Sequence, residues 1–130
     1  MDENSLNKVM KGARAYLRRR GLEPIDLIEG SSEIVAEDSS GKLVFAQVKA
    51  SDDTLPSADA SQRAREVREE LAIWWLKDHP EHADAALQFD LLSICLLTDD
   101  RAIIRHHQNC FGPDASHAAP TLDKPALKRA

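Results

Sequence analysis

Two polar side chains close an otherwise apolar segment, and their types and spacing could do chemistry. The segment runs from Gly41 to Lys49 and ends in Gln47-Val48-Lys49. In a β-strand, side chains two residues apart share a face, so Gln47 and Lys49 point in the same direction. Many metal-dependent nucleases hold a carboxylate and a lysine at this spacing. Because the carboxylate is here an amide, that substitution decides whether this protein is an enzyme.

A second set of chemically useful residues lies near the N-terminus. The net charge of −5 weakens a nucleic-acid interpretation, but residues 1–20 hold six basic and two acidic side chains, which leaves −9 for the rest. Affinity for phosphate comes mainly from clustered Lys and Arg. The candidates for nucleic-acid binding are therefore Lys8, Lys11, Arg14 and Arg18. The alternative is an ordinary solvated face that keeps an amphipathic helix in water.

The elements that must position these residues follow from apolar periodicity. Leu6, Val9, Met10, Ala13, Tyr16 and Leu17 recur at helical steps, which predicts a first helix with the basic residues on the opposite arc and Gly21 as its stop. Strands are predicted at roughly 22–28, 32–37 and 42–49. The last two form a hairpin around the turn formers Glu37 to Gly41.

After a polar loop at 50–59, a second helix is predicted from about Ala60 to Asp78, begun by Asp59 or Ser57. Its apolar stripe would run through Val67, Leu71, Trp74 and Trp75, with Arg68 among the charges of a solvated face, and both tryptophans are interpreted as core. A final strand pair is predicted at 88–97 and 102–106.

This element order indicates an α/β domain with a mixed β-sheet flanked by helices. We expect one domain over residues 1–111 and a disordered tail over 112–130. No run approaches the roughly 18 apolar residues of a membrane span, and the start is unlike a signal peptide, so we expect a cytoplasmic protein that does not engage the membrane.

The remaining chemical side chains form no convincing site by spacing. Cys95 and Cys110 are expected to be buried or half-buried free thiols. Neighbouring strand residues face opposite ways and Pro80 interrupts the other pair, so His106, His107, His79 and His82 are assigned surface or capping roles. No Ser-His-Asp or Cys-His arrangement can be picked out from spacing.

Several short segments, spread over nearly the whole of residues 1–111, occur in a characteristic order: Ala13-Arg14-Ala15-Tyr16-Leu17, Arg20-Gly21, Ser32-Glu33-Ile34-Val35, Leu43 to Lys49, Ala72 to Leu76, Gln88 to Leu92 and His106 to Phe111. In these segments and their order the chain resembles the YraN family, small bacterial proteins with a restriction-endonuclease-like fold related to archaeal Holliday-junction resolvases. The resemblance implies an order of α-β-β-β-α-β-β and a nuclease-like site.

That family pattern implies a Mg²⁺ site made of three carboxylates, at positions that are occupied here by Met10, Val35 and Gln47. Mg²⁺ is a hard cation that is held by carboxylates, waters and phosphates. Of the motif residues, Glu33 and Lys49 persist. We therefore expect Glu33, Gln47 and Lys49 to be the remnant of a catalytic site, with no metal and no other cofactor.

Three functions remain open. The favoured one is an inactive nuclease-fold module that binds DNA or RNA weakly, or a protein partner. The second is an active Mg²⁺-dependent, structure-selective endonuclease, whose metal site is rebuilt from Glu33, Glu37 or Asp38 near Gln47 and Lys49. The third is a structural oligomer, although the sequence does not specify the oligomeric state.

Glu33 is expected to pair with Lys49 or lie at the sheet edge. Lys49 is either a solvated strand end or a point charge for phosphate.

Overall fold

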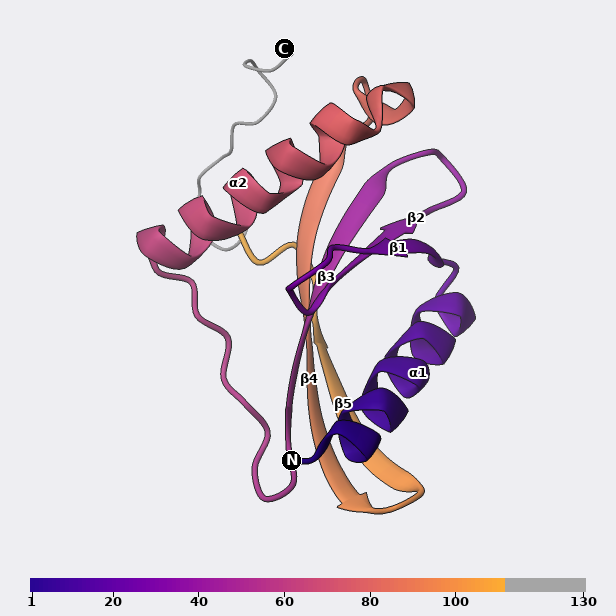
Figure 1. Cartoon of the computed structure of the whole chain (residues 1–130), viewed down its shortest axis with the longest axis vertical. Helices are drawn as coiled ribbons and strands as arrows, with labels where there is room; N and C mark the ends of the chain where they lie inside the picture. The colour runs from indigo at the N-terminus through magenta and orange to yellow at the C-terminus, as the bar shows by residue number, and fades with distance from the viewer. Residues whose placement is uncertain (112–130) are drawn as a thin grey trace.

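The computed structural model describes residues 1–111, so the tail predicted for 112–130 lies outside the described residues. The elements follow the predicted order (Figure 1): α1 (Glu3–Arg19), β1 (Glu23–Leu27), β2 (Glu33–Glu37), β3 (Leu43–Ser51), α2 (Gln62–Asp78), the 3₁₀ turn η1 (Pro80–His82), β4 (Leu87–Thr98) and β5 (Arg101–His107).

The five strands form one mixed sheet in the order β1-β2-β3-β4-β5. Strands β1, β2 and β3 are antiparallel neighbours, β4 runs parallel to β3, and β5 returns antiparallel to β4. The parallel pair requires a crossover, and α2 supplies it. The predicted mixed α/β architecture is confirmed, and it is consistent with a nuclease-like fold.

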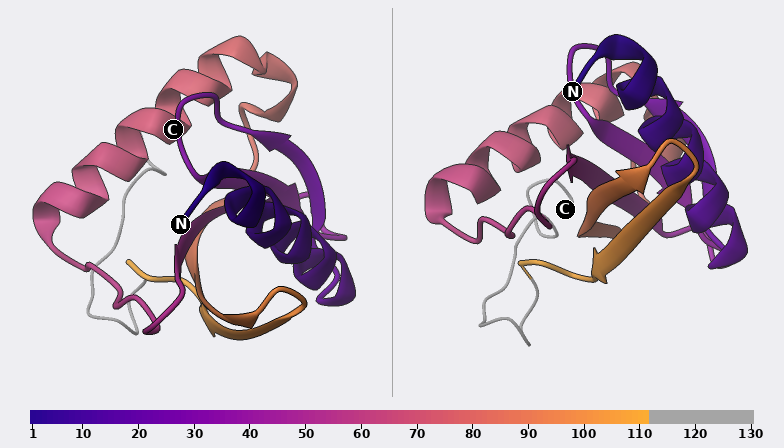
Figure 2. Two further views of the ribbon diagram at one scale, coloured as in Figure 1. Left: turned by 60° about the horizontal axis from the view of Figure 1, so that its bottom comes forward. Right: turned by 90° about the horizontal axis from the view of Figure 1, so that it is seen from below.

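Alternation along β3 divides the core between two faces of the sheet. Ala46 and Val48 pack beneath α1, whereas Leu43 and Phe45 pack beneath α2. The two helices therefore cover opposite faces, as the views in Figures 1 and 2 show. A residue's parity in β3 decides which helix it faces.

Local chemistry explains both ends of α1. The Asp2 side chain accepts a hydrogen bond from the Ser5 amide at 2.8 Å, which caps the N-terminus. Gly21 has a φ of +81°, and the Leu22 amide donates to the Leu17 carbonyl at 2.9 Å. This left-handed turn closes the helix where Gly21 predicted its end.

The face that α2 turns to the sheet differs from the prediction. Its buried residues are Arg68, Ala72 and Trp75, whereas Trp74 is 71% exposed and Val67 is 40% exposed. The predicted stripe was therefore offset, and the expectation that both tryptophans are core holds for Trp75 alone. Arg68 had been placed on the solvated face, and that assignment was wrong.

The start of α2 also lies later than predicted. Ser61 is the N-cap and accepts a hydrogen bond from the Ala64 amide at 3.1 Å. Asp59, predicted as a cap, instead accepts from the Ser61 amide at 3.0 Å. Hydrogen bonds from Ser61, above all the one from its amide, hold the pKa of the Asp59 carboxyl below its usual value.

Two further predictions concern the cysteines and the membrane. Cys95 is a buried free thiol and Cys110 a half-buried one, as predicted, and burial raises the pKa of the Cys110 thiol. Within residues 1–111, no helix combines the length and apolar character that crossing a membrane requires.

Candidate functional site

We call β3 the motif strand, because it ends in Gln47-Val48-Lys49, and the side chains of Gln47 and Lys49 point to the α2 face of the sheet. Gln47 and Lys49 share the parity of Phe45, as the two-residue spacing predicted. Gln47 stands between Glu33 on β2 and Leu91 on β4, and Lys49 stands beside Ser93. The Lys49 amine contacts the Ser57 carbonyl oxygen at 3.4 Å. The structure therefore brings Glu33 and Gln47 together in register, with Lys49 toward the loop that precedes α2.

Glu33 is held by an arginine that the sequence analysis had left in solvent. Both residues are buried, with 2% and 5% exposure. Arg68 Nε and Nη2 donate to the two Glu33 carboxylate oxygens at 2.6 and 2.9 Å. Both expected roles for Glu33, pairing with Lys49 and a place at the sheet edge, are wrong, since β2 lies between β1 and β3.

Arg68 also ties together the strands beneath it. Its Nη2 donates to the carbonyl oxygens of Phe45 on β3 and Asp90 on β4, both at 2.8 Å. Its guanidinium lies 5.3 Å from the Phe89 ring centre and 5.7 Å from that of Phe111. A planar, permanently charged group suits such a bidentate and stacked position. The pair therefore fastens α2 to three neighbouring strands.

The residues at the expected metal positions do not fit a Mg²⁺ site. Val35 is fully buried against Phe45 and Trp75, and Met10 packs on the α1 face, opposite Gln47. Glu33 already directs both oxygens to Arg68. Mg²⁺ needs oxygen ligands in a near-octahedral arrangement, with at least one carboxylate free to bind it, and this set offers a thioether, an alkyl group, an amide and a carboxylate already paired with Arg68. Within residues 1–111, no cluster of three His, Cys, Asp or Glu side chains could hold a metal ion.

The acids considered as substitutes lie at the other end of the hairpin. Glu33 is paired with Gln47, but Glu37 is paired with Leu43, four residues away along β3. At roughly 3.3 Å per residue, this separation is about 13 Å. Asp38 accepts hydrogen bonds from the Ser40 amide at 2.9 Å and the Lys42 amide at 3.0 Å, and is therefore a turn residue. Neither acid lies near Gln47 and Lys49.

The basic residues of α1 lie on its outer side. Lys8, Lys11 and Arg18 are exposed and Arg14 is half-buried, whereas Val9, Ala13 and Leu17 face the core. Arg18 forms an ion pair with Glu23 at 3.5 Å. Lys8, Lys11 and Arg14 have no carboxylate within 4.0 Å in the described part of the chain. The predicted basic arc therefore exists, and three of its four cations are available to a ligand.

A hydrogen-bonded chain on the α1 face joins residues that the sequence analysis did not connect. Asp90 on β4 is 1% exposed, and its Oδ2 lies 2.7 Å from His106 Nε2. His106 Nδ1 lies 3.2 Å from the Tyr16 hydroxyl on α1. The surface or capping role expected for His106 is therefore wrong. The cross-strand register, which pairs His106 with Leu92 beside Asp90, produces this contact.

Asp90 is ionised in spite of its burial. Burial raises the pKa of the Asp90 carboxyl, but hydrogen bonds from His106, the Asn109 amide and the Gln88 side chain together lower it below the usual value. The Asn109 and Gln88 donors lie 2.8 and 2.9 Å from Oδ1. With Asp90 charged, His106 Nε2 carries a proton and donates. In the neutral imidazole, Nδ1 then accepts from Tyr16.

Comparison with known proteins shows similarity over part of the chain. The chain is 39% identical over 80 residues to a UPF0102 protein of Rhodopseudomonas palustris (strain BisA53). The match covers 59% of this chain and 56% of the relative, so the chain spans little more than half the length of that protein. UPF0102 designates the YraN family, to which the sequence showed a resemblance. No family model matches the chain.

Proposed function

We propose that this protein is a nuclease-fold module that binds nucleic acid through α1 and does not cleave it. The observation that carries the proposal is the use of Glu33, the carboxylate retained from the motif. Because Arg68 occupies both of its oxygens, this acid serves the packing of α2 rather than a metal. Without a metal, the motif strand lacks the group that activates water and stabilises a leaving oxygen in such enzymes.

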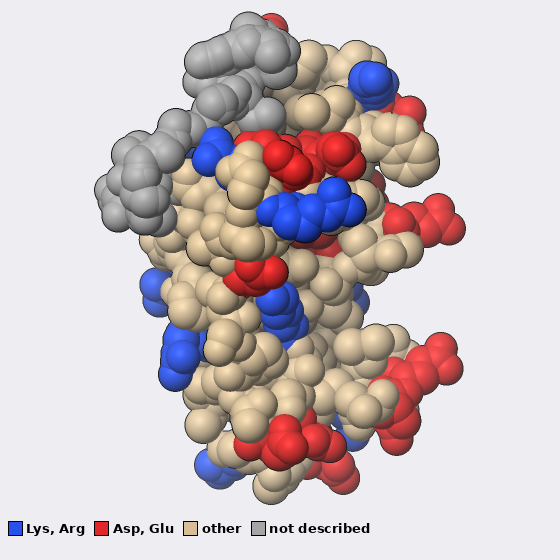
Figure 3. Space-filling view, turned by 90° about the vertical axis from the view of Figure 1, so that its left-hand side faces the viewer, with Lys and Arg blue, Asp and Glu red and all other residues tan. Residues whose placement is uncertain are grey.

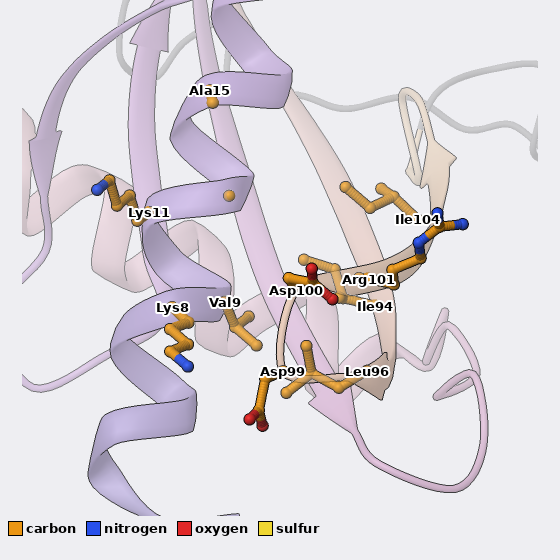
Figure 4. Close-up of a pocket in the computed structure, with 12 residues that line it drawn as sticks. Lys8, Val9, Lys11, Ala15, Ile94, Leu96, Asp99, Asp100, Arg101 and Ile104 are labelled. Carbon is orange, nitrogen blue, oxygen red and sulfur yellow. The ribbon is translucent and has the colours of Figure 1, made fainter.

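The cations of α1 support the binding half of the proposal. Lys8, Lys11 and Arg14 recur at three-residue steps, so they lie along one side of the helix. In the close-up of Figure 4, Lys8 and Lys11 extend from α1, with Lys11 directed away from the β4–β5 hairpin that carries Asp99 and Asp100. On the side of the molecule that carries α2, acidic and basic side chains are interspersed (Figure 3). Phosphates are therefore expected to contact α1.

A salt-dependent titration tests the binding. We expect single-stranded and branched DNA and RNA to bind weakly at low ionic strength, with affinity that falls as salt rises. Reversing three charges, in Lys8→Glu/Lys11→Glu/Arg14→Glu, should abolish that binding. The control Arg63→Glu/Lys77→Glu reverses two exposed cations of α2 and should retain most of the binding, because neither residue lies on α1. The double variant Lys8→Glu/Lys11→Glu, with the same change of net charge as this control, should weaken binding far more. Binding that is absent, or equally lost in both variants, contradicts the proposal.

A separate measurement tests the absence of cleavage. Calorimetric titration with Mg²⁺ and Mn²⁺ should give no saturable heat, and a panel of branched, nicked and single-stranded substrates should remain intact with either metal. Metal-dependent cleavage that disappears in Lys49→Ala would instead establish an enzyme. The two measurements are independent, so one half of the proposal can fail while the other stands.

A further inference from the structure

A polar cavity of about 410 Å³ opens on the α1 face, at the end of the sheet where α1 stops. Small-molecule sites in proteins commonly have volumes of about 300–1,000 Å³. Its walls come from the turn after α1, the β2–β3 turn and strands β3, β4 and β5. The residues that define its chemistry are Arg20, Asp38, Lys42, Gln88, His106 and Gln108, above the buried Asp90. The cavity contains neither the motif strand end at Gln47 and Lys49 nor the cations Lys8, Lys11 and Arg14.

The floor of this cavity is fixed by hydrogen bonds. His106 is held from one side by Asp90 and from the other by Tyr16. The Gln88 amide nitrogen donates to Asp90 at 2.9 Å, and its carbonyl oxygen accepts from the Lys42 amine at 2.7 Å. The polar groups are thus oriented before any ligand arrives, which lowers the entropy cost of binding.

The negative charges around the cavity are already bound, whereas the positive charges are not. Asp90 takes donors from three residues, and Asp38 Oδ1 takes donors from its own turn. The Lys42 amine donates to the neutral Gln88 side chain. The hydrogen bond from the Ser40 side chain, together with the charge of Lys42, lowers the pKa of the Asp38 carboxyl. The Arg20 guanidinium lies 5.7 Å from the Tyr16 ring centre. Among the described residues, neither cation has a carboxylate within 4.0 Å. Two cations from different elements thus face one cavity with unfilled donor capacity.

We infer that this cavity binds the phosphate group of a nucleotide, either a free nucleotide or the terminal nucleotide of a strand. The Arg20 guanidinium presents paired donors that match phosphate oxygens, and Lys42 adds a point charge. A bare phosphate would leave most of the volume unfilled. The side-chain amides of Gln88 and Gln108 supply donors and acceptors for a sugar or base. This inference does not depend on α1 binding nucleic acid, because the cations of that surface lie outside the cavity.

An NMR titration of the full chain with thymidine 5′-monophosphate tests the site. We expect saturable shifts of the Gln88 and Gln108 side-chain amides and of the His106 ring. Thymidine, which lacks the phosphate, and inorganic phosphate, which lacks the nucleoside, should each bind at least about tenfold more weakly. Equal affinity for either probe, or shifts confined to the outer side of α1, would overturn the inference.

Variants then locate the contacts. Lys42→Gln and Arg20→Gln each remove a charge from the cavity and should weaken thymidine 5′-monophosphate by about tenfold, the loss of one charge-assisted hydrogen bond. The control Lys77→Gln and the α1 variant Lys8→Gln/Lys11→Gln/Arg14→Gln should leave the affinity unchanged. If the α1 variant weakens the nucleotide as much as Lys42→Gln does, the affinity reflects overall charge and the site is refuted.

Two short oligonucleotides distinguish the source of the nucleotide. A six-residue single strand is compared with and without a 5′-phosphate, in wild type and in Lys42→Gln. A terminal-nucleotide site predicts tighter binding of the phosphorylated strand, with that advantage lost in Lys42→Gln. A free-nucleotide site predicts equal binding of the two strands while thymidine 5′-monophosphate still shifts Gln88 and His106. Failure of all phosphate-bearing probes to shift these residues refutes both forms, whatever α1 binds.

Discussion

On the α2 face of the sheet, buried Glu33 is held by the guanidinium of Arg68, whereas on the α1 face buried Asp90 is held by an imidazole and two neutral donors. Arg68 directs its donors to both Glu33 oxygens and to two backbone carbonyl groups. His106 meets Asp90 with one ring nitrogen and the Tyr16 hydroxyl with the other. One carboxylate thus faces a guanidinium in a closed pair, and the other an imidazole within a longer hydrogen-bonded chain.

The surroundings of the two carboxylates also differ in how much room they leave for a ligand. The guanidinium of Arg68 is enclosed by Phe89, Phe111 and two carbonyl groups, so it has little room for a ligand. His106 and Asp90 border a cavity that also holds Lys42. On the α2 face, to which Gln47 and Lys49 point, the retained carboxylate Glu33 therefore serves the packing of α2. The opposite face retains polar groups that a ligand can reach.

The largest expected effect comes from breaking the α2-face pair. Glu33→Ala leaves the Arg68 charge buried without a counter-ion, which should lower the free energy of unfolding by about 3–5 kcal/mol. Urea denaturation followed by far-UV circular dichroism measures the change. A loss below about 1 kcal/mol would show that Arg68 escapes to water when Glu33 is removed.

Two further variants make that result specific. Glu33→Leu/Arg68→Met removes both charges at similar volume and should be more stable than Glu33→Ala, although the carbonyl groups of Phe45 and Asp90 lose a donor. Glu69→Ala breaks a half-buried pair with Arg65 on the same helix and should cost at most about 0.5 kcal/mol. If Glu69→Ala costs as much as Glu33→Ala, the loss reflects the helix rather than the buried pair.

The next effect should depend on pH. Asp90→Asn weakens hydrogen bonds to a charged acceptor and should cost about 2 kcal/mol at pH 7. The pKa of the Asp90 carboxyl is lowered in the folded protein, from 3.8 in its ordinary state. Its stabilisation is therefore complete above that value and is lost as pH falls through the folded-state pKa. Unfolding curves of wild type and Asp90→Asn should converge below about pH 4, and a constant difference down to pH 2 would contradict this account.

Much of the fold could be predicted because it depends on local patterns. The helical spacing of Val9, Ala13 and Leu17, the turn formers before Gly41 and the apolar run of β4 each specify an element within a few residues. The face of α2 could not be predicted, because Val67, Leu71 and Trp74 form as regular a stripe as Arg68, Ala72 and Trp75. Glu33, which lies 35 residues before Arg68, decides between the two.

Less of the candidate site could be predicted, for a related reason. The shared face of Gln47 and Lys49 follows from strand geometry alone, and the outer position of Lys8 and Lys11 follows from helical periodicity. The contact of Tyr16 with His106 joins residues 90 positions apart and depends on the register of β5 against β4. One signal was present in the sequence, because Asp90 interrupts an apolar strand, and such an acid needs buried donors.

A smaller effect is expected from the α1 end of the hydrogen-bonded chain. Tyr16→Phe removes the hydroxyl that meets His106 at 3.2 Å and should cost about 1 kcal/mol, the usual value of one neutral hydrogen bond. The His106 ring signals should shift in the NMR spectrum, while the Trp75 indole signal on the other face stays in place. A shift of the Trp75 signal would show that the two faces are coupled through the sheet.

The smallest effect is expected at the residue that first pointed to chemistry. Lys49 is half-buried, and its amine makes one long, solvent-exposed contact with the Ser57 carbonyl oxygen at 3.4 Å. Lys49→Ala should therefore change the free energy of unfolding by less than about 0.5 kcal/mol, as is usual for surface positions. If Lys49 is a solvated strand end, the variant also keeps the wild-type affinity for DNA. If it is a point charge for phosphate, the salt dependence of binding should weaken by about one phosphate contact. A stability loss above about 2 kcal/mol would mean that Lys49, like Arg68, holds the α2 face together, and the contrast between a packed centre and a solvated end of that face would fail.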